Sequence, residues 1–248
     1  KITNKTFTYD YYGNPLYVID EGDAAISGDE KYYNYSYAYD DEKWIMDRVA
    51  KNSVYDENKV RIKETLFYYD ELGLNAIEDK GALTKTEQWD SSGNNSYTYY
   101  EYDDYGNIIK ETDSLGNSVA YAYEGTFTYP TSAVNALGHI TKYDYDLGTG
   151  NLNYQEKNGI RTAYEYDVFG RVVKEIKPLD SIGLPTKSYT YTFDGIAPEI
   201  IKVSLKTTSN KTNDIYYYYD GLAQLVQLKT NAENGQQIVK NIFYDSLG

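Results

Sequence analysis

Residues 100–109 read YEYDDYGNII, and residues 164–173 read YEYDVFGRVV. In both stretches aromatic residues alternate with acids, an Asp opens a Gly-containing turn, and two β-branched residues follow. Asp at the first position of a type I turn accepts a backbone N–H through its carboxylate, and Gly is favoured at the fourth position. Val, Ile, Thr and Tyr fit a pleated, half-buried surface. Each stretch therefore predicts a strand, a tight turn and a return strand.

The same signals recur along the whole chain. Turn starts between residues 103 and 167 fall every 10 or 11 residues. We expect the repeat to be carried by the Tyr-Asp pairs and the turn glycines, namely Tyr9, Asp10, Gly13, Tyr69, Asp70, Gly73, Tyr102, Asp103, Gly106, Asp113, Gly116, Tyr145, Asp146, Tyr166, Asp167, Gly170, Tyr219, Asp220, Tyr244 and Asp245. No linker divides the chain, so we expect one repetitive domain over residues 1–248.

Some copies of the turn depart from the pattern. Asp-x-x-Gly also occurs at 90–93 and 180–183, whereas the copy that starts at Asp220 lacks the late glycine and the copy at Asp40 has none. Where the glycine is present, as in Gly106 and Gly170, we expect a left-handed backbone that a Val substitution would strain. An Asn follows the glycine in several copies, and Asn also tolerates that conformation.

The segments between the turns alternate with a period of two residues. In residues 159–167, Ile160, Thr162, Tyr164 and Tyr166 share one face. Only Glu42–Asn52 could pass for a helix. The period predicts roughly twenty antiparallel strands, and a twisted open sheet seldom exceeds about ten without curling. We therefore expect an all-β fold, in which antiparallel β-hairpin repeats form one long curled or spiralling sheet, part of a hollow shell or solenoid.

Composition excludes several functional classes. The 248 residues include 32 Tyr, and 24 basic against 38 acidic residues give a net charge of −14. This charge argues against nucleic acid or an anionic membrane as the partner. Cysteine is absent, which leaves no disulfide and no thiolate zinc site. No run of about 18 apolar residues predicts a membrane-spanning helix.

The candidate chemical sites are better explained by the repeat. His139 occupies the slot that Asn107 or Arg171 fills in other copies, and paired acids such as Asp103 and Asp104 fall on turns. Residues 143–151 resemble a calcium loop only slightly, because the third acid and the distal Glu are missing. We therefore expect no catalytic, cofactor or dedicated metal site, and no enzyme. Two interpretations of the Tyr-rich faces are open: the rings form a structural ladder along the sheet, or they form a surface that stacks on sugars.

The repeat resembles the RHS, or YD, repeat family, whose consensus is close to Tyr-x-Tyr-Asp-x-x-Gly-Arg/Asn followed by an apolar pair. Residues 100–109 and 164–173 match it, and the similarity extends over nearly the whole chain. The resemblance implies a β-hairpin ribbon that spirals into a hollow shell, which encloses a cytotoxic C-terminal segment in bacterial toxins and belongs to large surface proteins in teneurins. Members with cargo carry an Asp-Pro cleavage motif, and no Asp-Pro occurs here.

The resemblance therefore leaves two interpretations open. Either the cargo end lies outside this sequence, or the protein carries no cargo. The turn expected at residues 243–248 has no return strand after it, which favours a piece of a longer ribbon. We expect a non-enzymatic wall segment of a secreted or cell-surface protein, bacterial in context, whose partner is the rest of its own chain. The alternative is a cell-surface adhesion module that binds glycans or a protein through its Tyr-rich faces. No nucleic acid and no membrane insertion are expected.

Overall fold

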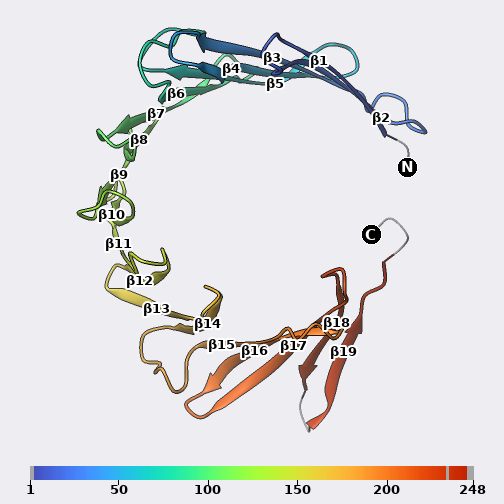
Figure 1. Ribbon diagram of the computed structural model, residues 1–248, viewed down its shortest axis with the longest axis vertical. Helices are drawn as coiled ribbons and strands as arrows, with labels where there is room; N and C mark the ends of the chain where they lie inside the picture. The colour runs from blue at the N-terminus through green and yellow to red at the C-terminus, as the bar shows by residue number, and fades with distance from the viewer. Residues whose placement is uncertain (1–2, 233–234, 245–248) are drawn as a thin grey trace. The chain divides into compact units, whose positions relative to one another are not determined.

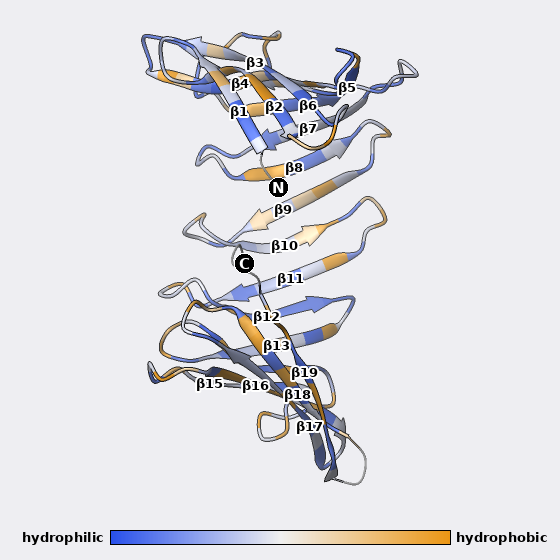
Figure 2. Ribbon diagram, turned by 90° about the vertical axis from the view of Figure 1, so that its right-hand side faces the viewer, coloured by the Kyte–Doolittle hydropathy of each residue, from blue (hydrophilic) through white to orange (hydrophobic). Residues whose placement is uncertain are grey.

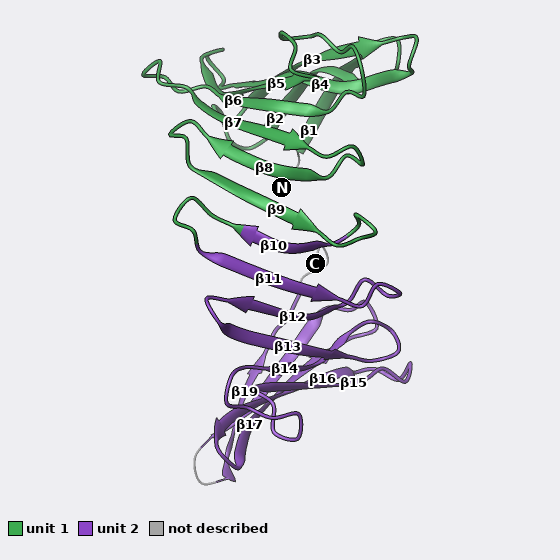
Figure 3. Ribbon diagram, turned by 90° about the vertical axis from the view of Figure 1, so that its left-hand side faces the viewer, with its two compact units in different colours: residues 1–128, 134–138 green, residues 129–133, 139–248 purple. Residues whose placement is uncertain are grey.

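The computed structural model describes residues 3–232 and 235–244, which form strands and turns without an α-helix (Figure 1). The chain divides into two compact units (Figure 3). The first unit comprises residues 1–128 and 134–138, and the second comprises residues 129–133 and 139–248. Each unit is described by itself below.

The 19 strands found in the described residues are assigned to a single sheet, and the strands that pair within each unit do so antiparallel. The first unit contains β1 (Thr3–Tyr9), β2 (Pro15–Asp23), β3 (Lys31–Asp40), β4 (Ile45–Tyr55), β5 (Arg61–Tyr69), β6 (Leu83–Gln88), β7 (Ser96–Tyr102), β8 (Ile108–Asp113) and β9 (Ser118–Tyr123). The second contains β11 (Ile140–Tyr145), β12 (Leu152–Lys157), β13 (Ile160–Tyr166), β14 (Val172–Ile176), β15 (Lys187–Thr192), β16 (Glu199–Thr208), β17 (Lys211–Tyr219), β18 (Leu225–Asn231) and β19 (Gln237–Asn241). The short β10 (Pro130–Val134) lies at the boundary.

The predicted all-β fold of antiparallel hairpins is thus confirmed, whereas the predicted curling of the sheet stays a prediction. Within a unit each strand pairs with the next, as β7 does with β8 through Tyr100 opposite Glu111. Consecutive turns therefore fall on opposite edges of the sheet. We call the edge that carries the turns after odd-numbered strands the first edge, and the other the second edge.

A β-bulge precedes most turns of the first edge. The register shifts immediately before the Tyr of the Tyr-Asp pair, at Thr8/Tyr9, Tyr68/Tyr69, Glu101/Tyr102, Asp144/Tyr145, Glu165/Tyr166 and Tyr218/Tyr219. A bulge adds one residue on one strand and re-aims the side chains beside it. The Tyr of each pair consequently stands at a fixed irregularity rather than in a uniform ladder.

The fold has little conventional core. The chain exposes 16051 Å² of surface, whereas a compact monomer of this mass exposes about 11,000 Å². The buried cluster Ala38, Ala50 and Tyr69 lies in the first unit, where Ile77 of the segment between β5 and β6 packs against it. Hydrophilic residues occupy much of the strands, with hydrophobic residues interspersed in short stretches (Figure 2). Both faces of a single layer are therefore largely accessible.

The helical interpretation of Glu42–Asn52 is wrong. A turn ends at Trp44, whose φ is +59°, and β4 runs from Ile45 to Tyr55 between β3 and β5. Ala50 is fully buried in that strand. The cross-strand packing of a central strand outweighs the weak helical pattern of the local sequence.

Candidate functional site

The Asp turn at residues 103–107 shows the geometry of the repeat. Asp103 Oδ1 accepts hydrogen bonds from the backbone N–H of Tyr105 at 2.9 Å and of Asn107 at 2.8 Å. The backbone N–H of Gly106 donates to the Asp103 carbonyl, and Gly106 has a φ of +88°. The predicted role of the carboxylate and the predicted left-handed glycine are both confirmed at this turn.

The same arrangement recurs on both edges. The carboxylate of the first residue accepts the N–H groups of the third and fifth residues in the turns that start at Asp10, Asp113, Asp167 and Asp220. Gly13, Gly93, Gly116 and Gly170 are left-handed. The Asn117 side chain donates to Asp113 and, against the opposing effect of desolvation, holds the pKa of that carboxyl below its usual value. These hydrogen bonds favour the ionised form of the Asp.

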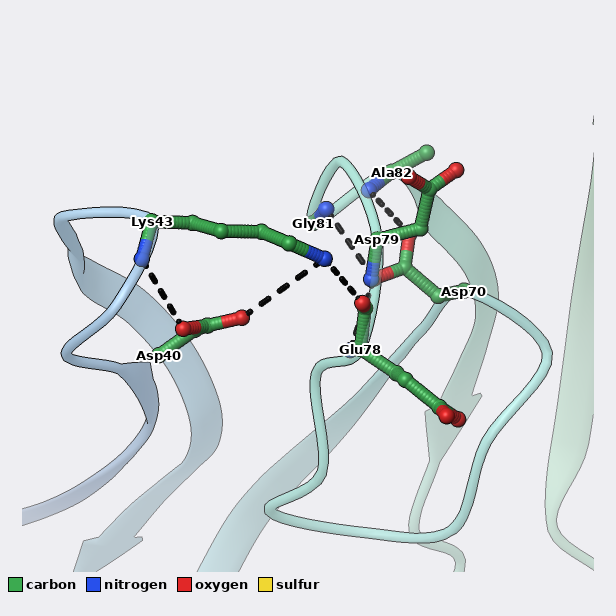
Figure 4. Close-up of polar contacts among 7 residues, drawn as sticks. All are labelled: Asp40, Lys43, Asp70, Glu78, Asp79, Gly81 and Ala82. Atoms are coloured by element: carbon green, nitrogen blue, oxygen red, sulfur yellow. Dashed lines mark hydrogen bonds and ion pairs between the residues drawn. The ribbon is translucent and has the colours of Figure 1, made fainter.

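The copy at residues 70–73 was predicted as the same turn, and that prediction is wrong. Gly73 is not left-handed; Asp70 itself has a φ of +50°. Its carboxylate instead accepts the backbone N–H groups of Glu78, Asp79, Gly81 and Ala82, at 2.9 to 3.2 Å (Figure 4). Desolvation opposes these four bonds, yet together they lower the pKa of Asp70. The carboxylate thereby organises the whole segment between β5 and β6.

The copy at residues 180–183 also differs, because Gly183 is not left-handed. Asp180 accepts a hydrogen bond from the Thr186 hydroxyl and pairs with Lys206. Conversely, the copy without a late glycine still forms the turn: Ala223 takes a φ of +60°, and Asp220 accepts the N–H groups of Leu222 and Gln224. The late glycine is thus not required for this turn.

A second device uses tyrosine. The Tyr102 hydroxyl, at the end of β7, donates to the carbonyl of Leu83, at the start of β6, at 2.7 Å. Equivalent bonds, which we call tyrosine latches, run from Tyr37 to Pro15, Tyr69 to Val49, Tyr123 to Ile108, Tyr166 to Leu152, Tyr191 to Val172 and Tyr244 to Leu225. Each joins the residues that end one strand to the strand before it. The sequence placed these tyrosines on a ladder but did not identify their partners.

Several tyrosines of the predicted Tyr-Asp repeat make other contacts instead of a latch. Tyr9, on β1, is 57% exposed and stacks on Phe7. Tyr145 stacks on Tyr129 with ring centroids 5.0 Å apart, and desolvation raises its pKa. Tyr219 lines a hollow on the first edge. Asp245 lies outside the described residues.

The Asn after the turn glycine does not use the left-handed conformation that it tolerates. The Asn107 amide donates to Asp103 Oδ2 at 2.9 Å and to the Phe127 carbonyl of the neighbouring turn at 2.8 Å. Asn14 makes the same pair of contacts, with Asp10 and the Met46 carbonyl. The amide of this Asn therefore joins its own turn to a neighbouring segment at the first edge. The sequence does not show this role, because the second partner is distant along the chain.

Both faces of the sheet in the second unit combine rings or aliphatic side chains with ion pairs. The face that carries Tyr191 also presents Ile201, Val203 and Tyr217, which border a shallow hollow of about 440 Å³, and Lys187, which pairs with Glu175 at 3.0 Å. The opposite face carries the pairs Lys174–Glu165 and Lys202–Asp214, each at 2.8 Å, together with the Tyr216 ring beside Lys202.

The acids of the calcium-like loop accept hydrogen bonds from nearby groups of the chain. Asp146 of the calcium-like loop accepts the N–H groups of Gly148 and Thr149, and Asp144 accepts the Asn153 amide. No group of three potential metal ligands was found in residues 3–232 and 235–244. The same part of the chain has no helix long and apolar enough to span a membrane.

Comparisons with known proteins find similarity in solved structures alone. No protein-family model and no curated protein matches the chain. Two crystal structures with TcdB2-TccC3 in their names, the TEV and Cdc42 forms, align with 96% and 98% of this chain at 13% identity, with TM-scores of 0.45 and 0.46. A Tc holotoxin pore of Photorhabdus luminescens aligns with 96% at 13% identity and a TM-score of 0.40. The chain covers 15 to 16% of those chains.

Proposed function

We propose that this chain is a non-enzymatic wall segment of a large secreted or surface protein of RHS type, whose β-shell encapsulates a toxin or C-terminal domain. The observation that carries the proposal is the lattice on the first edge, where Asp turns and tyrosine latches alternate along each unit. Such a lattice ties many of the hairpins to their neighbours without a thick core. It suits a wall, which must be stiff while only one layer deep.

The accessibility of both faces supports the same proposal. In the second unit each face combines rings or aliphatic side chains with ion pairs, so each can border an aqueous environment. Adhesion through the Tyr-rich faces is less well supported. The latch hydroxyls already donate to backbone carbonyls, as Tyr166 does to Leu152 at 3.0 Å, and all their rings except that of Tyr244 are buried or half-buried.

The proposal is tested by peptide mass spectrometry of the native protein beyond Gly248. We expect further Tyr-Asp repeats, an Asp-Pro cleavage motif and then an unrelated C-terminal domain that co-purifies with the repeats after cleavage. Repeats that end in a wall anchor or a binding domain, without cleavage, would contradict encapsulation and favour an adhesin. A native chain without further repeats would contradict both.

A further inference from the structure

The two edges of the sheet differ in the apolar side chains that they expose. Among the described residues outside strands, every exposed aromatic ring lies on the first edge or in the segment after β19: Tyr11, Tyr12, Trp44, Tyr105, Phe127, Phe169, Phe193, Phe243 and Tyr244. The exposed apolar residues on turns of the second edge are aliphatic, with Leu115 and Leu137 as examples. Turn tips are ordinarily polar, so a one-sided selection of rings indicates an interaction surface.

A hollow of about 650 Å³ opens on this edge between two consecutive turns of the second unit. Its apolar walls are Phe193, which is 50% exposed, Ile201 and Tyr219. Its polar groups include Glu199 and Asp220. This volume and this mixture of rings with a few polar groups are typical of small-ligand sites.

One polar group of the hollow is unsatisfied. Glu199 Oε1 accepts the backbone N–H of Gly195 at 3.0 Å, whereas Glu199 Oε2 is buried without a hydrogen-bond partner. A buried acceptor without a donor is rare and costly. A ligand hydroxyl can supply the missing donor once the Glu199 carboxylate turns toward the hollow.

A second ring stands beside the hollow on the preceding turn of the same edge. Phe169 is 79% exposed, and the Arg171 guanidinium lies between it and the hollow, 5.1 Å from the Phe169 ring centroid and 5.2 Å from that of Phe193. Arg171 is itself held by Asp167, whose carboxylate Oδ2 is 2.7 Å from Nε. The result is a fixed platform of ring, guanidinium and ring. Successive turns on one edge are about 9.6 Å apart, twice the strand spacing and close to the length of a disaccharide.

We propose that the hollow and this platform bind a neutral oligosaccharide. The apolar faces of sugar rings stack on Phe169 and Phe193, and sugar hydroxyls donate to Glu199 and accept from Arg171. A net charge of −14 repels polyanionic glycans and does not oppose neutral ones. The inference goes beyond the wall proposed above and does not depend on whether the sheet encloses a cargo.

The test is calorimetric titration of the full 248-residue chain with three probes: cellohexaose, N-acetylchitohexaose and maltohexaose. We expect at least one to bind, and Phe193→Ala and Phe169→Ala each to raise its Kd about tenfold or more, which corresponds to about 1.4 kcal/mol. Glu199→Gln is expected to weaken binding by a smaller factor, because the amide keeps one acceptor. The matched controls are Leu115→Ala and Leu137→Ala on the second edge, which should leave Kd unchanged.

Circular dichroism of each variant separates loss of the site from loss of the fold. Phe169 serves as the second variant because its exposed ring is not needed for packing. Failure of all three hexasaccharides to bind overturns the inference, as does equal weakening by the second-edge controls. Preferential binding of heparin, or of hexylamine in place of the sugars, also overturns it. None of these results bears on the mass-spectrometric test of the wall.

Discussion

The tyrosine latch predicts a specific loss of stability on removal of one oxygen atom. Tyr102→Phe keeps the ring but deletes the 2.7 Å hydrogen bond to the Leu83 carbonyl. An intramolecular hydrogen bond contributes about 0.5–1.5 kcal/mol net, so we expect the free energy of unfolding to fall by about 1 kcal/mol. For a chain of this size, that loss lowers Tm by roughly 2–4 °C.

The matched control is Tyr105→Phe, three residues further along the chain. Tyr105 is 68% exposed, and its ring stacks on Phe127 with centroids 4.2 Å apart. The control keeps this stacking and removes a hydroxyl that faces water, so we expect a change within about 0.5 kcal/mol. Urea unfolding followed by circular dichroism measures both variants under the same conditions.

Hydrogen exchange shows where the loss acts. Because a repeat lattice couples mainly to its nearest neighbours, Tyr102→Phe should increase amide exchange in β6 and β7 and leave β16 and β17 unchanged. Equal stability of Tyr102→Phe and Tyr105→Phe would refute the latch as a stabilising device. Increased exchange that spreads evenly over both units would refute its local action.

Three further predictions concern the turns and the titrating groups. Ala223→Gly should raise the free energy of unfolding by about 0.5–1 kcal/mol, because Ala223 holds a φ of +60°. Gly106→Val should lower the free energy of unfolding by about 1–2 kcal/mol, because Gly106 has a φ of +88°. The opposite order of stabilities in urea unfolding would contradict the left-handed assignment. Asp70→Asn should cost about 2 kcal/mol and make the segment from 71 to 82 more sensitive to limited proteolysis, because an amide cannot accept all four N–H groups. Burial and then the hydrogen bond to Glu87 raise the pKa of Tyr68 from 10.0 to about 12. The contribution of Tyr68 to stability is therefore complete below pH 10 and is lost as the pH rises through 12, where tyrosinate absorbance and circular dichroism should change together. Full ionisation of Tyr68 near pH 10 with the fold intact would contradict this prediction.

The turns were predictable from the sequence because their chemistry is local. Asp103 and the Gly106 and Asn107 that follow it carry nearly all the information for their own turn, and the carboxylate and the left-handed glycine were found as expected. Asp70 shows the limit of this logic. The long segment between β5 and β6 brings four N–H groups of later residues to its carboxylate, and these outcompete the short turn.

The latches and the second contact of Asn107 were not predictable in the same way. The partner of Tyr102 is a carbonyl 19 residues earlier, and the pairing depends on the strand register and on the bulge before Tyr102. A one-dimensional pattern of aromatic residues does not encode that register. Similarly, Asn107 meets Phe127 only because the two turns share an edge. The exposed rings of the first edge were visible in the sequence, but their common side required the strand pairing.

The adjacency of Tyr and Asp has a physical reason in the copies Tyr102-Asp103 and Tyr166-Asp167. At the first edge an odd-numbered strand ends, and it must be tied both to the strand before it and to the strand after it. In Tyr102-Asp103 the tyrosine hydroxyl reaches back to β6, while the carboxylate folds the turn that leads into β8. At such a position the latch joins the end of one strand to the strand before it, directly beside the turn that leads to the next strand. Among the described residues, the latches start from odd-numbered strands or from the segment after β19, so the second edge carries turns without latches of this kind. The latches therefore add hydrogen bonds beside the first-edge turns, and such bonds help to hold exposed rings in position for a ligand.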